Sequence, residues 1–331
     1  MEAILRSGLV FGKAALLGGL LAGCVETQEA QQATGQAASG TFTAGSPLGV
    51  MVEDQFSPMS ENVKVYGGVV NAESCSYHEG GDLIVVVNRG VNQDQVPNDG
   101  FISLLNHDGS VHTANWIGTN REGLILNHPL GSDTWDGRLY VADRDGGTSD
   151  QDPSVSVIRW FDLETGAPMG EVPIDDSEGF NDLAIAEDGT IYATDTGASR
   201  LYEVSPDGSW RVLLDGAPLN LPNGVAMDND GNIVIVNIGD AEVITLSPTG
   251  ATLATEQAVQ AGNDGLVILE DGTKYVSSVR EGGVSRIRPG EPAELIASNI
   301  PSAASMCYDV GGNQLVIPLN PNNAVAIVPL D

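Results

Sequence analysis

A short phrase that recurs along this chain constrains its fold more than any other feature. Each copy begins with a polar residue, runs through small and apolar residues to an acidic-glycine turn, and ends in a β-rich segment, as in residues 181–193, 223–235 and 264–276. Asp-Gly suits a tight hairpin because both residues tolerate positive φ. A second hairpin follows each copy, such as the one that turns at Asp207-Gly208. Four strands per repeat, at a spacing of ~40 residues, is typical of a β-propeller blade.

Weaker copies of the phrase bring the number of repeats to six, with turn glycines at Gly81, Gly137, Gly189, Gly231, Gly272 and Gly312. The last repeat ends before a fourth strand can form. Residues 62–66, just before the first repeat, are expected to supply that strand, since this closes the ring and covers an open sheet edge. The sequence therefore predicts an all-β fold over residues 48–331, a six-bladed β-propeller whose ring is closed by an N-terminal strand.

Residues 1–23 have the pattern of a lipoprotein signal peptide and are left out of the fold. Arg6 and Lys13 precede an apolar run that is too short to span a bilayer, and this run ends in Leu-Ala-Gly before Cys24. The motif resembles the bacterial lipobox, whose cysteine is acylated; an ordinary secretory signal that contains a cysteine is the alternative. Residues 24–47 predict a disordered tether. We therefore expect a bacterial cell-envelope protein, lipid-anchored at Cys24 and facing the periplasm or the exterior.

The charge of the chain excludes one class of partner. There are 45 acidic residues and 14 basic ones, which gives a formal net charge of -31. Such a surface repels phosphate backbones and anionic lipid headgroups, and it most simply serves solubility. We expect a monomer that acts on a small-molecule substrate, binds no nucleic acid and meets the membrane only through the N-terminal lipid.

One position in each repeat points to a metal site in the central channel. Counting back eight residues from each turn glycine gives Glu73, Pro129, Asn181, Asn223, Asp264 and Ala304. The first strand of a propeller blade lines the channel, so these positions converge at one height. Four of these six residues, Glu73, Asn181, Asn223 and Asp264, have side chains that carry oxygen. Hard oxygen ligands suit Ca²⁺, with Mg²⁺ or Mn²⁺ as alternatives, whereas Zn²⁺ prefers His and Cys. Asn and Asp also cap turns at strand starts, but a glutamate in the same register favours the metal site.

At these residues the chain resembles the senescence-marker-protein/gluconolactonase family, also called regucalcin-like. The family phrases are matched by Glu73, Phe180-Asn181-Asp182, Pro222-Asn223-Gly224 and Asn263-Asp264-Gly265. The resemblance covers about residues 62–331 and implies a six-bladed propeller with a divalent metal, as in calcium-dependent lactonases and a phosphotriesterase. It implies that Glu73 and Asn223 are metal ligands and that Asn181 binds metal or substrate. It also implies that Asp264 is both a ligand and the catalytic base or nucleophile.

The same resemblance does not extend to the substrate. Family lactonases follow the glutamate with Gly-Pro, whereas Ser74-Cys75 follows Glu73, and the first two blades carry insertions at 88–100 and 143–153. His128 adjoins the channel position Pro129, which makes it a candidate for substrate binding and proton shuttling, although a histidine at a strand edge is the simpler interpretation.

We expect a Ca²⁺-dependent, lactonase-like hydrolase of cyclic or activated esters. The alternatives are a non-catalytic propeller that binds a ligand or partner protein, and another kind of enzyme such as a strictosidine-synthase-like propeller. The fold alone does not choose among them.

The two remaining cysteines belong to blades that are neighbours in the closed ring. Cys75 lies six residues before its turn glycine and Cys307 lies five before its own. Adjacent positions in a strand face opposite sides of the sheet. We therefore predict two buried free thiols; a disulfide, which an exported location permits, is the alternative.

Overall fold

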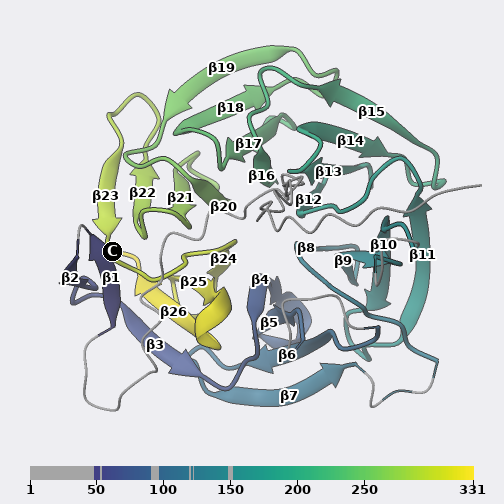
Figure 1. Ribbon diagram of the computed structural model, residues 1–331, viewed down its shortest axis with the longest axis horizontal. Helices are drawn as coiled ribbons and strands as arrows, with labels where there is room; N and C mark the ends of the chain where they lie inside the picture. The colour runs from purple at the N-terminus through teal and green to yellow at the C-terminus, as the bar shows by residue number, and fades with distance from the viewer. Residues whose placement is uncertain (1–47, 53, 91–96, 119–120, 122, 148–151) are drawn as a thin grey trace, which may run out of the picture. The chain divides into compact units, whose positions relative to one another are not determined.

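The computed structural model describes residues 48–52, 54–90, 97–118, 121, 123–147 and 152–331. These residues form six four-stranded antiparallel sheets around a central channel, which confirms the predicted six-bladed propeller (Figure 1). The helical turns among them are η1 (Glu79–Gly81) and η2 (Asn320–Asn322). No helix in the described ranges is long and apolar enough to cross a membrane. The predicted signal peptide, tether and acylated Cys24 lie outside the described residues.

The first five blades follow one another in chain order, and the first strand of each is its innermost. Blade 1 contains β4 (Ala72–His78), β5 (Leu83–Asn88), β6 (Phe101–Leu105) and β7 (Val111–Ile117). Blade 2 contains β8 (Ser132–Trp135), β9 (Arg138–Asp145), β10 (Val155–Asp162) and β11 (Pro168–Ile174). Blade 3 contains β12 (Asp182–Ile185), β13 (Ile191–Asp195), β14 (Arg200–Val204) and β15 (Trp210–Asp215). Blade 4 contains β16 (Pro222–Met227), β17 (Ile233–Asn237), β18 (Glu242–Leu246) and β19 (Thr252–Gln257). Blade 5 contains β20 (Asn263–Ile268), β21 (Lys274–Ser278), β22 (Val284–Ile287) and β23 (Glu294–Ala297).

Blade 6 joins the two ends of the described chain. It contains β24 (Cys307–Asp309), β25 (Gln314–Leu319), β26 (Ala324–Pro329) and, as its outermost strand, β3 (Lys64–Gly67). β3 pairs antiparallel with β26, so that Tyr66 lies opposite Val325. The predicted closing strand is therefore confirmed, shifted slightly from residues 62–66. A hairpin of β1 (Gly49–Val52) and β2 (Gln55–Pro58), which the repeat did not predict, lies outside the six blades.

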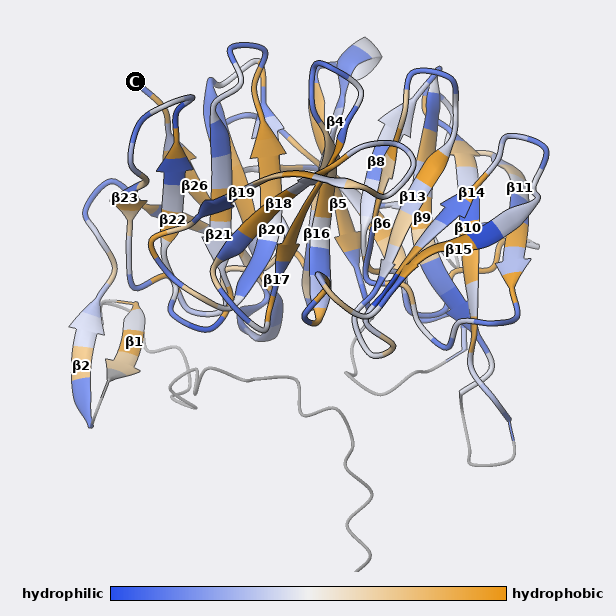
Figure 2. Cartoon of the chain, turned by 90° about the horizontal axis from the view of Figure 1, so that it is seen from above, coloured by the Kyte–Doolittle hydropathy of each residue, from blue (hydrophilic) through white to orange (hydrophobic). Residues whose placement is uncertain are grey.

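The core lies between neighbouring blades. Successive side chains of a strand point to opposite faces, and a blade in the ring is covered on both faces. The second strands therefore read as nearly continuous apolar runs; Val85 and Val87 of β5, for example, belong to one cluster with Leu139 and Val141 of β9. Figure 2 shows apolar residues along the strands and polar residues in many of the turns. Each buried aliphatic side chain of this kind stabilises the fold by about 1.5–3 kcal/mol.

Three polar residues at the ends of second strands cap nearby loops, two of which lead into the channel. They recur six positions after the turn glycine, and each accepts a backbone N–H: Asp143 from His128, Asp195 from Ala198 and Asn237 from Asn220. Their regular spacing therefore reflects structural capping.

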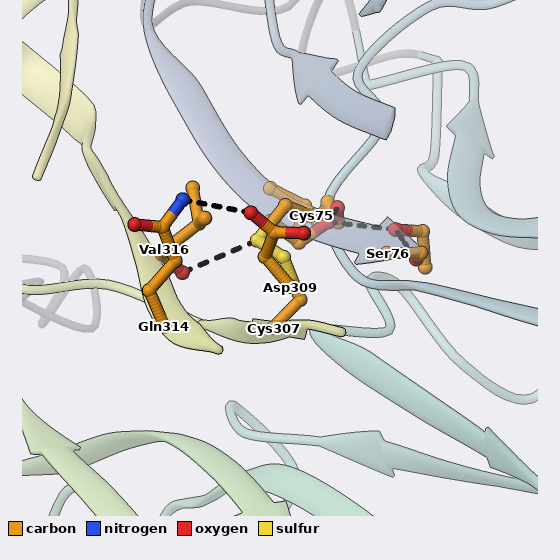
Figure 3. The surroundings of a disulfide bond; sticks show 9 residues. Cys75, Ser76, Cys307, Asp309, Gln314 and Val316 are labelled. Atoms are coloured by element: carbon orange, nitrogen blue, oxygen red, sulfur yellow. Dashed lines mark hydrogen bonds between the residues drawn. A yellow bond between two sulfur atoms is a disulfide. The ribbon is translucent and has the colours of Figure 1, made fainter. Parts of the chain in front are cut away.

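The prediction of two free thiols is wrong, because Cys75 of β4 and Cys307 of β24 form a disulfide with a Cα–Cα distance of 5.4 Å (Figure 3). Blade 1 packs on blade 6 with one face and on blade 2 with the other. On the second face, Ser76 contacts Ser132 of blade 2 at 2.8 Å. Two adjacent blades meet through opposite faces, so side chains one register position apart converge rather than diverge.

Candidate metal centre

Three of the four predicted ligands lie at irregularities near the start of inner strands. The pairing register shifts at Glu73 in β4, at Asn223 in β16 and at Asp264 in β20. Such bulges re-aim a side chain out of the regular alternation, and here they occur where the inner strands enter the channel. All three residues are buried, with 6%, 1% and 4% exposure respectively. Asn181, directly before β12, is half-buried, and its carbonyl accepts a hydrogen bond from Gly131 at 2.7 Å.

The glycines of the Asn-Gly and Asp-Gly phrases have a packing role. A Cβ added to Gly224 would lie 2.3 Å from the carbonyl oxygen of Asp264, in the next blade. One added to Gly265 would lie 2.6 Å from the nitrogen of Met306. Glycine therefore lets neighbouring inner strands approach closely around the channel, and this approach brings the ligand positions together.

Asn223 and Asp264 are brought together, and each leaves an oxygen unsatisfied. Asn223 Nδ2 lies 3.5 Å from Asp264 Oδ2. Asn223 Oδ1 and Asp264 Oδ1 are buried and have no hydrogen-bond partner among the described residues. Buried acceptors without a partner cost free energy, so they favour the arrival of a cation or a donor. In the described part of the chain, the side chain of Asn181 makes no hydrogen bond or ion pair to the other three candidates.

The surroundings of Glu73 and Asp264 disfavour the charged forms of both carboxylates. Burial and the nearby charges of Glu73 and Asp182 raise the pKa of Asp264 well above its usual range. Burial also raises the pKa of Glu73, against the opposing effect of Arg89. No cluster of three or more His, Cys, Asp or Glu that could hold a metal is found in the described ranges. A cation would therefore need amide oxygens beside two carboxylates, a donor set that fits Ca²⁺.

Two residues that the repeat alignment missed contact Glu73. Arg89 Nη1 lies 3.5 Å from Glu73 Oε2, and Asn320 donates its side-chain N–H to the same oxygen. Each follows the second strand of its blade, eight residues after the turn glycine at Gly81 or Gly312. Counting eight residues forward from these glycines, rather than backward, would have found Arg89 and Asn320. Asn320 Oδ1 is also buried without a partner among the described residues.

His128 reaches this cluster through Arg89. Its Nε2 accepts from Arg89 Nε at 3.1 Å and from Nη2 at 2.7 Å. Burial, followed by the charges of Arg89 and Arg144, lowers the pKa of His128 to about 2. The imidazole is therefore neutral, and proton shuttling through Nε2 would require it to release the guanidinium.

A cavity of about 250 Å³ lies further along the channel, toward the hairpin turns of the inner strands. Among the residues that line it are Ser76, Asp133 and Asp182. Burial raises the pKa of Asp133 to about 6 and that of Asp182 to about 7. Asp182 also accepts the backbone N–H of Val225 at 3.2 Å, which ties blade 3 to blade 4.

Solved structures share the fold at low sequence identity. A gluconolactonase from Xanthomonas campestris aligns with 18% identity and a TM-score of 0.56, over 81% of this chain and 90% of that one. A protein of unknown function from Bacteroides thetaiotaomicron aligns with 14% identity and a TM-score of 0.57, over 81% and 76%. A catalytically inactive virginiamycin B lyase from Staphylococcus aureus, solved with quinupristin, aligns with 12% identity and a TM-score of 0.53, over 82% and 100%. At these identities the likeness concerns the fold alone.

The family assignment comes from the sequence itself. No curated protein matches the chain significantly. The model of the SMP-30/gluconolactonase/LRE-like region matches residues 73–317, a span that begins at Glu73 and includes every candidate ligand. The chain therefore belongs to the SMP-30/gluconolactonase/LRE-like family.

Proposed function

We propose that this protein is a Ca²⁺-dependent hydrolase of cyclic or activated esters, similar to the lactonases. One observation carries the proposal: Asn223 Oδ1 and Asp264 Oδ1 are buried, adjacent and without a partner among the described residues. Membership of a family named after gluconolactonase supports a lactone as the substrate. Mg²⁺ and Mn²⁺ are the alternative ions.

In this proposal Glu73, Asn223 and Asp264 hold the ion, and Asn181 is a further ligand or donates to the substrate. When bound there, a cation would supply Lewis-acid polarisation of the carbonyl oxygen of the ester. Asp264 would take a proton from the water that attacks the carbonyl carbon, after which the ester C–O bond breaks and the alcohol leaves; alternatively its carboxylate would attack the carbonyl carbon, release the alcohol and form an acyl-enzyme that water hydrolyses. Arg89 and Asn320 fix the orientation of Glu73.

We place the protein in the bacterial cell envelope, anchored through lipid on Cys24 and facing the periplasm or the exterior. The disulfide between Cys75 and Cys307 supports this, because disulfides persist in oxidising compartments. The propeller acts as a monomer on a small molecule, and its net charge of -31 disfavours nucleic acid.

Calorimetric titration of Ca²⁺ into the chelator-treated full chain tests the proposal. We expect one equivalent to bind, and Asp264→Asn to abolish binding. The matched control Asp188→Asn, in an exposed turn where Asp188 accepts the N–H of Thr190 at 2.9 Å, should bind as the wild type does. A screen of lactones should then show hydrolysis that depends on the ion. If Ca²⁺, Mg²⁺ and Mn²⁺ all fail to bind the wild-type chain, the metal centre is refuted.

A non-catalytic, ligand-binding propeller is the second candidate. It is favoured by the contacts of Arg89 and Asn320 with Glu73, because a guanidinium and an amide already compensate this carboxylate. Absence of metal binding, together with retained folding, would favour it.

A further inference from the structure

The inner strand of blade 6 has an alanine in the register where four other blades have a candidate ligand. This residue is Ala304, whose side chain carries no oxygen. Its backbone N–H donates to the carbonyl of Pro318 at 3.2 Å, and an isolated bridge pairs Ala303 with Leu319. The end of β25 therefore lies against the backbone that leads into β24. Asn320, the first residue of η2, follows β25 directly and brings an amide to this side of the channel.

Contacts between blades 6 and 1 fix the position of Asn320. Asn323, which ends η2 in a left-handed conformation, accepts the backbone N–H of Asn71 through Oδ1 at 2.8 Å. Asn71 lies two residues before Glu73, and the side-chain N–H of Asn320 donates to Glu73 Oε2. Both ends of the short turn η2 are thus attached to the segment that carries Glu73. The amide of Asn320 therefore has a defined place beside this carboxylate.

The same amide leaves its oxygen unused. Asn320 Oδ1 is buried and has no hydrogen-bond partner among the described residues, so Arg89, the arginine that contacts Glu73, makes no bond to it. Asn223 Oδ1 and Asp264 Oδ1 are in the same condition. Buried acceptors are normally satisfied, because leaving them without a partner costs free energy. Three oxygens in or beside the candidate metal centre therefore lack a positive charge or a donor.

The two carboxylates beside these oxygens favour a cation over a neutral donor. After burial, the charge of Glu73 is the next cause that raises the pKa of Asp264, so the two groups repel each other and a cation would offset this repulsion. An amide carries its oxygen and one of its N–H groups on the same side. When that N–H is the one donated to Glu73, a single ion can touch Asn320 Oδ1 and the carboxylate together. Ca²⁺ takes about six to eight oxygens, which leaves room for a ligand beyond those that the repeat supplies.

We propose that Asn320 is a ligand of the metal ion and binds it through Oδ1. This inference rests on the proposed function, because the ion is the one that Glu73, Asn223 and Asp264 would hold. The side-chain N–H of Asn320 keeps its contact with Glu73, so one amide both orients a ligand and supplies another. Blade 6 then contributes to the centre from the end of its second strand, in place of the alanine on its inner strand.

Luminescence of Tb³⁺, an ion that takes oxygen ligands as Ca²⁺ does, gives a test that does not depend on activity. Its lifetimes in H₂O and in D₂O count the waters bound to the ion. With the full chain, we expect Asn320→Ala to hold about one more water than the wild type, because a water takes the place of Oδ1. Asn320→Asp and the control Asn322→Ala, on the same turn, should keep the wild-type count. Asp264→Asn, which lacks the site, gives the background from the acidic surface.

Calorimetry with Ca²⁺ separates a ligand from a residue that only orients Glu73. An ionised aspartate cannot donate to Glu73, but it can bind the ion. We expect Asn320→Asp to bind Ca²⁺ at least as tightly as the wild type, and more tightly than Asn322→Asp, which adds the same charge at an exposed position. Weaker binding by Asn320→Asp, or an unchanged water count in Asn320→Ala, would overturn the inference and leave the metal centre standing. If neither Ca²⁺ nor Tb³⁺ binds the wild type, the inference and the proposed function are both refuted.

Discussion

Breaking the disulfide between Cys75 and Cys307 should remove a large part of the stability of the propeller. The two residues are 232 positions apart in the sequence, so the bond restricts the unfolded chain over almost the whole ring. A chain-entropy treatment gives about 5 kcal/mol for a loop of this length, although measured values are often smaller. The ring is closed a second time where β3 pairs with β26, so the folded state should survive. We expect Cys75→Ala/Cys307→Ala to lower the free energy of unfolding by about 3–5 kcal/mol.

Unfolding in guanidinium chloride, followed by tryptophan fluorescence, measures this loss. Three samples are compared: the oxidised wild type, the wild type under reductant, and the double variant. The reduced wild type is the matched control, because it lacks the bond but keeps both side chains. Its midpoint should agree with that of the double variant. A midpoint that reduction leaves unchanged would refute the argument, as would alkylation of both thiols in the native protein without reductant.

Three further predictions concern the metal centre. Gly265→Ala should destabilise the fold by about 1–3 kcal/mol in chemical unfolding, because its Cβ would meet Met306 N at 2.6 Å; the control Gly67→Ala, with its nearest neighbour at 3.9 Å, should not. Asn320→Ala should weaken Ca²⁺ binding about tenfold by calorimetry through loss of its contact with Glu73, whereas Asn322→Ala on the same turn should bind normally. The raised pKa of Asp264 means that the folded state binds its proton more tightly than the unfolded state. The metal-free protein should therefore lose stability as pH rises above the usual range of an aspartate, and Asp264→Asn should reduce this loss in pH-dependent thermal melts; an unchanged pH profile would contradict it.

The sequence could predict the blades because each blade is made of local hairpins. The acidic-glycine turns mark the hairpin between the first two strands, and the strands themselves are short and apolar. The closing strand followed from one missing strand at the C-terminus and one spare strand at the N-terminus, and β3 fills that place. The β1–β2 hairpin carries no copy of the repeat, so nothing in the pattern pointed to it.

Counting back from the turn glycines was sufficient to find the candidate ligands on the inner strands, because the shift in pairing register occurs at the same position in three blades. The register shifts at Glu73, Asn223 and Asp264, and each of these lies eight residues before its turn glycine. A count made along one strand cannot show which face of a blade meets its neighbour. That relation depends on the closed ring, and for this reason the two cysteines were assigned to diverging faces when they converge.

The contacts that were missed come from the ends of second strands, where loop lengths differ between blades. Asn320 and Glu73 are 247 residues apart in sequence, and the ring brings them together only when blade 6 meets blade 1. Arg89 reaches Glu73 from within a single blade, but its orientation depends on His128 in the next one. The inner strands therefore carry the part of the site that follows the repeat. The residues after the second strands differ from blade to blade, and those are the positions where selectivity for one substrate can arise without loss of the propeller.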